Sequence, residues 1–129
     1  MRDKVIQDRT RLQERYLEDD LPTRLRGLAT NLARIQSFSH HSANQAAVER
    51  LLEESKLFIE WTAGELDIDS AAELVTMQIQ LAQWQRNWRS LWADTAQRIK
   101  MTNRAGDWSK RVLELLFSLS RGVASKEAP

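Results

Sequence analysis

The chain has 129 residues, of which 42% are hydrophobic and 29% charged, and its 19 basic and 18 acidic residues leave a net charge of +1. This size fits one domain with a single core, and the near-neutral charge gives no general argument for nucleic-acid binding. The absence of cysteine excludes disulfides, thiolate metal sites and thiol nucleophiles. No apolar stretch reaches the ~20 residues that span a bilayer, and the first residues lack a signal-peptide core. We therefore expect a soluble, cytoplasmic protein that does not enter a membrane.

Residues 2–19 carry closely spaced charges of both signs and few apolar residues, which is typical of a solvated helix. Their apolar stripe, Val5, Leu12 and Tyr16, is out of phase with the leucine stripe that follows. The phase changes at an Asp-Asp-Leu-Pro sequence, which is a typical helix start. The sequence therefore predicts a short first helix, a break or kink, and a core helix over about 21–38.

The next helix is expected over about 43–64, because Ser42 and Gln45 have the spacing of a capping box. Besides its core stripe, this helix carries a second apolar pair, Leu57 and Trp61, on nearly the opposite side. A helix with two apolar faces is either packed between neighbours or keeps one face for a partner.

A second capping box, at Ser70, precedes a stretch without helix breakers, which predicts a continuous helix over about 71–104, ~50 Å long. Trp84, Trp88 and Trp92 lie four residues apart within it. Residues at this spacing share a helical face, so the three indoles form a ribbon that must be buried. We interpret this ribbon as the spine of the core.

The last helix is expected over about 108–121. Gly106 is expected to end the helix before it, and Asp107 to cap its N-terminus. Gly122 is expected to end this helix. Residues 1–122 then form a single helical domain, and 123–129 form a flexible C-terminal tail.

The predicted fold class is all-α, because the sequence contains no alternating strand pattern and no hairpin turn signal. Four core helices are joined by connections of about 2–6 residues, which favours antiparallel neighbours. We therefore predict an up-down antiparallel four-helix bundle, with residues 2–19 as an additional N-terminal helix or kinked helical extension.

The sequence contains no recognisable catalytic or cofactor motif. A di-metal bundle needs Glu-x-x-His motifs, and neither His40 nor His41 has a glutamate three residues before it. A Gly-x-Ser-x-Gly turn and a glycine-rich phosphate loop are also absent. We therefore expect a protein that is not an enzyme and has no metal or cofactor.

The spacing Arg34-x5-His40, or x6 to His41, resembles the Arg-x4–6-His element of the HEPN helical ribonucleases. The resemblance implies an arginine that stabilises phosphate charge and a histidine that moves a proton, in a cleft between dimerised bundles. That family usually places the element near a later helix, and this chain does not. We favour a surface arginine with loop histidines and keep the ribonuclease as an alternative.

Charge is distributed unevenly along the chain: residues 49–73 hold eight acids against two bases, and residues 86–111 hold seven bases against two acids. In an antiparallel pair the two segments could face each other, which needs no ligand, and we favour this interpretation. The alternative is a basic patch near Trp108 that binds RNA or anionic lipid. The seven bases are Arg86, Arg89, Arg98, Lys100, Arg104, Lys110 and Arg111.

Five tryptophans, together with apolar pairs outside the main stripes, exceed what one small core comfortably hides. The excess could form a homodimer face, a groove for a partner, or a pocket for a planar apolar ligand. Tryptophan and arginine also alternate over residues 84–89, which is typical of interface hot spots. The interface or pocket candidates are Leu57, Trp61, Trp84, Trp88, Trp92, Trp108, Leu113 and Phe117.

A longer pattern resembles a group of uncharacterised small helical proteins of cyanobacteria. The similarity rests on Leu81-x-x-Trp84-Gln85-x-x-Trp88-x-x-Leu91-Trp92, followed by Trp108-Ser109-x-Arg111-Val112-Leu113. It implies a biological setting and no activity.

The sequence thus favours a non-enzymatic helical protein–protein interaction module that self-associates. One alternative is a small-molecule-binding bundle whose pocket is lined by Trp84, Trp88, Trp92 and Trp108. A second alternative is an RNA-binding or HEPN-like ribonuclease module.

Overall fold

The computed structural model describes the backbone of residues 2–127 and the side chains of residues 3–121. Within these residues the protein is all-α and contains no strand. None of the helices in this part of the chain is long and apolar enough to cross a membrane. The helices are α1 (Arg2–Glu18), α2 (Leu21–Phe38), α3 (Gln45–Thr62), α4 (Ile68–Arg86), α5 (Trp88–Ala93) and α6 (Thr95–Glu127), with short 3-10 turns at Ser42–Asn44 and Ala63–Glu65.

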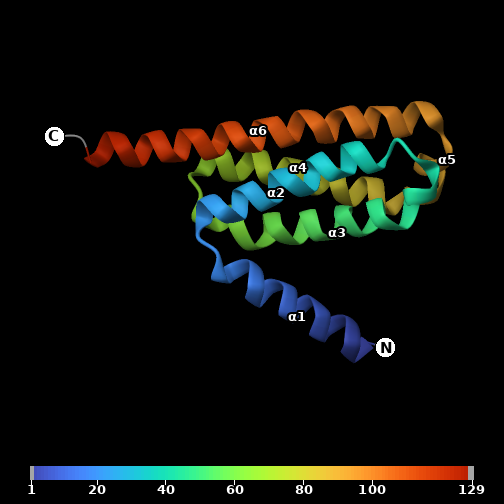
Figure 1. The fold of residues 1–129 in the computed structure, drawn as a ribbon, viewed down its shortest axis with the longest axis horizontal. Coiled ribbons are helices and arrows are strands. Elements are labelled where there is room, and N and C mark those ends of the chain that lie inside the picture. The colour runs from blue at the N-terminus through green and yellow to red at the C-terminus, as the bar shows by residue number, and fades with distance from the viewer. Residues whose placement is uncertain (1, 128–129) are drawn as a thin grey trace.

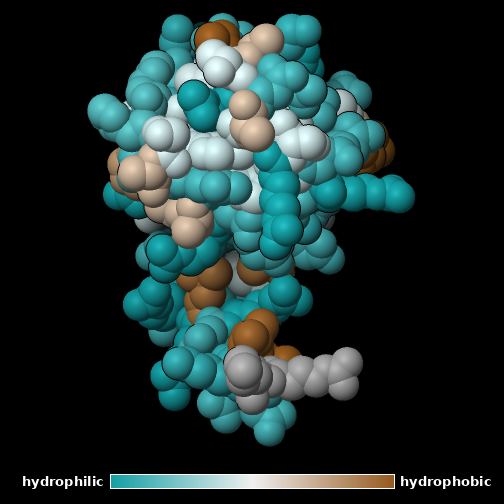
Figure 2. Space-filling view, turned by 90° about the vertical axis from the view of Figure 1, so that its right-hand side faces the viewer, coloured by the Kyte–Doolittle hydropathy of each residue, from teal (hydrophilic) through white to brown (hydrophobic). Residues whose placement is uncertain are grey.

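Helices α2 to α6 form the body of the molecule, and α1 leaves it at the start of α2 and points away (Figure 1). Within the body, α2 packs against both α3 and α6, and α3 packs against α4. The long helices α2, α3, α4 and α6 run in alternating directions (Figure 1). Their buried apolar side chains form one core cluster, to which α1 contributes Tyr16. Figure 2 shows apolar side chains gathered between α1 and the body.

The predicted break between α1 and α2 is confirmed. The carboxylate of Asp20 accepts a hydrogen bond from the backbone N–H of Thr23 at 2.9 Å and so caps α2. Pro22 lies in the first turn, where its missing N–H group is not needed by the helix. The chain therefore changes direction at this cap, which sets the angle at which α1 leaves the body.

Both predicted capping boxes are wrong. Ser42 begins a 3-10 turn, and α3 starts at Gln45 without a side-chain cap. Helix α4 starts at Ile68, because the carboxylate of Asp67 accepts a hydrogen bond from the backbone N–H of Ser70 at 3.1 Å. An aspartate cap also places a negative charge at the positive end of the helix, which a serine cannot do.

The predicted continuous helix over 71–104 is wrong as well, because the chain breaks at Asn87 and Asp94. The carboxylate of Asp94 accepts hydrogen bonds from the backbone N–H groups of Ala96 and Gln97, at 3.0 and 3.2 Å. The side chain of Asn87 donates to a backbone carbonyl of the preceding turn. Side chains of these two types compete with helical backbone hydrogen bonds, so they end helices without glycine or proline. The break allows α6 to turn back along α2.

The predicted helix stop at Gly106 is wrong, since α6 runs through this residue and past Gly122 to Glu127. A Cβ atom at Gly106 would collide with the side chain of Gln36 on α2. The glycine therefore marks a close approach of α2 and α6 inside a helix. The predicted flexible tail, 123–129, extends into residues outside the described part of the chain and stays a prediction.

Candidate interaction surface

The three tryptophans of the predicted ribbon lie in the core, but not on one helix: Trp84 belongs to α4, and Trp88 and Trp92 belong to α5. Trp84, Trp88 and Trp92 are each at most 9% exposed. The ring of Trp84 stacks on that of Trp108 in α6, with 5.1 Å between centroids, and Trp88 and Trp92 contact each other at 5.2 Å. Because the rings of Trp88 and Trp92 are buried among core side chains, they are not positioned to line an open pocket for a planar ligand.

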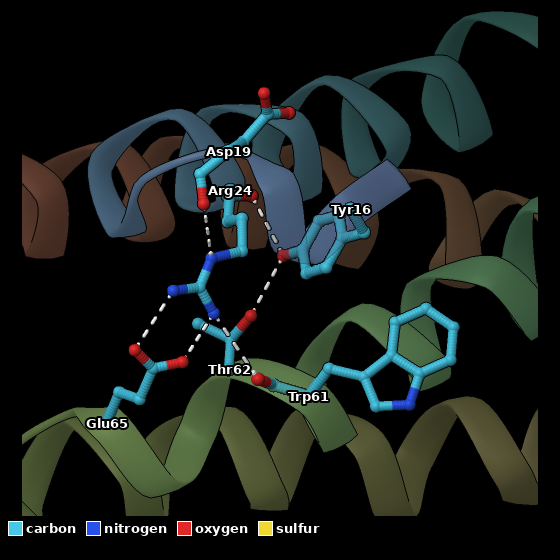
Figure 3. Close-up of polar contacts among 6 residues, drawn as sticks. All are labelled: Tyr16, Asp19, Arg24, Trp61, Thr62 and Glu65. Atoms are coloured by element: carbon cyan, nitrogen blue, oxygen red, sulfur yellow. Dashed lines mark hydrogen bonds and ion pairs between the residues drawn. The ribbon is translucent and has the colours of Figure 1, made fainter. Parts of the chain in front are cut away.

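The joint that holds α1 to the body is formed by its C-terminal turn, around Tyr16 (Figure 3). The ring of Tyr16 stacks on Phe58 of α3, with 4.1 Å between centroids, and also contacts Trp61. Its hydroxyl donates a hydrogen bond to the carbonyl of Arg24 at 3.0 Å and lies 2.9 Å from the hydroxyl of Thr62. One tyrosine thus connects α1 to both α2 and α3.

Arg24 completes this joint from α2, with a side chain that is only 7% exposed. Its guanidinium forms two hydrogen bonds with the carboxylate of Glu65, at 2.5 and 2.9 Å, and also donates to the carbonyls of Asp19 and Trp61 (Figure 3). The hydrogen bonds with Glu65 raise the pKa of Arg24 against the opposing effect of burial, and they lower the pKa of Glu65. A bidentate pair fixes both distance and orientation, so the corner between α1 and α2 is fixed on the end of α3.

The ionisation of Tyr16 gives a test of the closed joint. Burial raises the pKa of Tyr16 from 10.0 to about 12, although the hydrogen bond with Thr62 lowers it. The neutral phenol therefore stabilises the folded state fully below pH 10, and this stabilisation is lost as the pH rises towards 12. Tyr16 is the only tyrosine, so phenolate absorbance reports on it alone. We expect a midpoint near pH 12 in the folded protein. A midpoint equal to that of the denatured chain would show that the joint is open to water.

Towards its N-terminus α1 diverges from α3 and leaves an open groove of about 790 Å³. Val5 and Leu12 of α1 and Leu57 of α3 provide the apolar lining. Val5 is 60% exposed, whereas Leu12 and Leu57 are partly buried. We name this feature the α1–α3 groove. Its charged rim consists of Asp8, Arg9, Arg11, Glu14, Arg15, Glu18, Arg50, Glu53 and Glu54.

One ion pair crosses the α1–α3 groove, between Arg9 and Glu53 at 3.1 Å. Glu53 also accepts a hydrogen bond from Gln85 and pairs with Lys56. Burial acts to raise the pKa of Glu53, but the hydrogen bond from Gln85 and the charges of Lys56 and Arg9 outweigh it, so the pKa is lowered. A surface pair of this kind contributes at most about 1 kcal/mol. The N-terminal part of α1 is therefore held much more weakly than the joint.

The predicted basic residues do not form one patch. Arg98 donates to the carbonyl of Trp92 at 3.0 Å, and its guanidinium lies over the ring of that tryptophan. Arg111 pairs with Glu73 of α4 at 2.6 Å. This ion pair joins the basic segment 86–111 to the acidic segment 49–73, as expected from the sequence. Arg89 and Lys110 are exposed. The other three bases are Arg86, Lys100 and Arg104, and they line a separate hollow.

The remaining candidates lie on the surface or at its edge. Arg34, His40 and His41 are exposed, and among the described residues no hydrogen bond or ion pair joins the arginine to either histidine. Leu113 is partly buried, whereas Phe117 is 61% exposed. Both lie on α6, four residues apart, and the exposed member of the pair is Phe117.

An apolar stripe that the sequence interpretation missed lies on the outer side of α4. Its members Ile68, Val75 and Ile79 are 86%, 40% and 55% exposed. The sequence does indicate this stripe, because its members are spaced by seven and four residues, which places their side chains on one side of a helix. The stripe is a second exposed apolar surface and serves below as a control for the α1–α3 groove.

Among the residues that the structure describes, no group of three or more His, Asp or Glu is placed to hold a metal ion. No family model matches the sequence, and no curated protein and no solved structure is significantly similar to it.

Proposed function

We propose that the protein is a non-enzymatic helical interaction module that self-associates through α1 and the α1–α3 groove. The observation that carries this proposal is the contrast between the two ends of α1. Its C-terminal turn is fixed by Tyr16, whereas Val5 and Ile6 near its N-terminus are each 60% exposed. Most of the stability of a helix in a protein comes from tertiary packing of its apolar face, which the N-terminal part of α1 largely lacks. A second chain that covers these apolar side chains would stabilise α1 along its whole length.

The charges of α1 favour a second copy of the same chain as the partner. Basic and acidic residues alternate along the helix and nearly cancel, so α1 has no strong preference for an acidic or a basic partner. In a two-fold dimer the same patch faces itself, and an antiparallel copy of α1 can bring opposite charges together. Its basic residues are Arg2, Lys4, Arg9, Arg11 and Arg15, and its acidic residues are Asp3, Asp8, Glu14 and Glu18.

We further propose that α2, α3, α4 and α6 form an up-down four-helix bundle that holds the C-terminal turn of α1. Support comes from their alternating directions (Figure 1) and from their shared core. Helices α4 and α6 are joined by the stack of Trp84 on Trp108 and by the pair of Glu73 with Arg111. The contacts of Tyr16 then fix the position of the C-terminal turn of α1 relative to this bundle.

Light scattering after size exclusion, over a series of protein concentrations, tests the proposal. The chain has a mass of 15.0 kDa, and we expect the measured mass to rise towards twice this value as the concentration increases. Because apolar burial drives the contact, raising the salt concentration should not dissociate the dimer. A constant mass of one chain at the highest concentration would contradict self-association.

A further inference from the structure

A hollow of about 690 Å³ lies between α4, α5 and the first turns of α6 and shares no lining residue with the α1–α3 groove. Arg86 of α4 and Lys100 and Arg104 of α6 line it. Lys100 and Arg104 are one helical turn apart, so they lie on the same side of α6. All three side chains are exposed, and within the described part of the chain none forms an ion pair. Their mutual repulsion is therefore not neutralised by an ion pair with any carboxylate among the described side chains.

The rest of the lining suits an anion. Gln80 and Gln83 of α4 are polar neutral residues of its lining whose side-chain amides are free of the Asp94 cap, and none of its lining residues is acidic. The neighbouring carboxylate of Asp94 already accepts hydrogen bonds from backbone N–H groups at the start of α6 and from the side-chain amide of Gln97, the latter at 3.1 Å. Amide N–H groups donate hydrogen bonds to phosphate oxygens, as Arg and Lys do.

The fold explains why the hollow is there. The stacked rings of Trp84 and Trp108 fill the space between α4 and α6 below it. The break at Asn87 then carries the chain into α5, whose Leu91 lines the hollow together with Met101 and Trp84. The lining of the hollow thus combines three cations with three apolar side chains, and its volume lies within the range of about 300–1,000 Å³ typical of small-molecule sites.

We propose that this hollow binds a phosphorylated small molecule of nucleotide size, with Arg86, Lys100 and Arg104 as its phosphate ligands. The site is independent of the α1–α3 groove. An extended RNA surface is disfavoured, because Arg98 and Arg111 are engaged in contacts within the protein and Arg89 and Lys110 do not line the hollow. Three cations in one recess select a compact ligand with several negative charges.

Isothermal titration calorimetry of the full chain, in a buffer free of phosphate, tests the site with pyrophosphate and ADP as probes. We expect saturable binding of both, and a loss of affinity of at least tenfold in the double variant Lys100→Gln/Arg104→Gln, since each charge-assisted contact contributes about tenfold or more. The matched control, Arg89→Gln/Lys110→Gln, removes the same two charges outside the hollow and should bind as the wild type does. All four side chains are exposed, so circular dichroism should show both variants folded.

Several results would overturn the proposal. One is the absence of saturable binding of pyrophosphate and ADP at millimolar concentration. Another is an equal loss of affinity in the two variants, which would indicate general charge attraction. A third is tighter binding of a single-stranded RNA, dependent on Arg89 and Lys110, which would indicate an extended nucleic-acid surface. Binding to phosphatidylglycerol vesicles without binding of the free probes would assign the three cations to a lipid headgroup instead.

Discussion

Replacing Val5 with glutamate is expected to abolish self-association while leaving the body folded. Val5 is 60% exposed in the single chain, so a charge there costs the monomer little. In a two-fold dimer the substitution occurs twice, and each copy loses about 1.5–3 kcal/mol of apolar burial. The sum of about 3–6 kcal/mol weakens the dissociation constant by a factor of roughly 10² to 10⁴. Light scattering across a concentration series measures this change.

The matched control is Ile79→Glu, which introduces the same charge on the exposed stripe of α4. Ile79 is 55% exposed, so the two substitutions begin from nearly equal exposure. Dimerisation through the α1–α3 groove predicts that Ile79→Glu leaves the dimer intact. If Ile79→Glu dissociates the dimer and Val5→Glu does not, the interface lies on α4 and the proposal is wrong.

Replacing Trp88 with alanine is expected to lower the free energy of unfolding by about 3–5 kcal/mol. The side chain is 5% exposed and packs against Trp92, so its removal leaves a cavity in the core. Replacing Trp88 with phenylalanine should cost far less. The indole N–H of Trp88 is buried and has no hydrogen-bond partner among the residues that the structure describes, so removing it recovers part of the desolvation cost of that group.

Trp92→Phe provides the comparison, because the indole N–H of Trp92 donates to the carbonyl of Ser42 at 3.2 Å. This substitution leaves a carbonyl without its partner, so it should cost about 1 kcal/mol more than Trp88→Phe. Urea unfolding followed by circular dichroism measures all three variants. A cost for Trp88→Phe equal to or above that for Trp92→Phe would contradict the assigned hydrogen bonding.

The sequence predicted the all-α class and the break before α2 because both are properties of short segments. The periodic leucines and the acidic, proline-containing helix start determine the local structure of residues close to them in the chain. Gly106 was misread for the opposite reason. Its role depends on Gln36 of a neighbouring helix, which no local pattern reports. The breaks at Asn87 and Asp94 were missed because the sequence interpretation took glycine and proline as the helix breakers, whereas these two side chains end helices by hydrogen bonding to the backbone.

The α1–α3 groove was partly visible in the sequence and the joint was not. Leu57 stood out as an apolar residue off the main stripe, and Val5 and Leu12 as a stripe out of phase with α2. Arg24 lies beside Leu25 in the leucine stripe, and its burial depends on Glu65, 41 residues later in the chain. Pairing across such a separation follows from the fold, so the joint could be found only in three dimensions.

The central claim, that two copies meet through α1, is tested most directly by the distance between the α1 helices in solution. The chain has no cysteine, so one introduced cysteine carries one nitroxide label per chain. Gln7 on α1 and Thr76 on α4 are both exposed and suit this purpose. Contact through α1 predicts strong dipolar coupling between copies labelled at Gln7, and a longer distance or no coupling for Thr76. The reverse order, or no coupling from Gln7 at concentrations where the protein is dimeric, would contradict it.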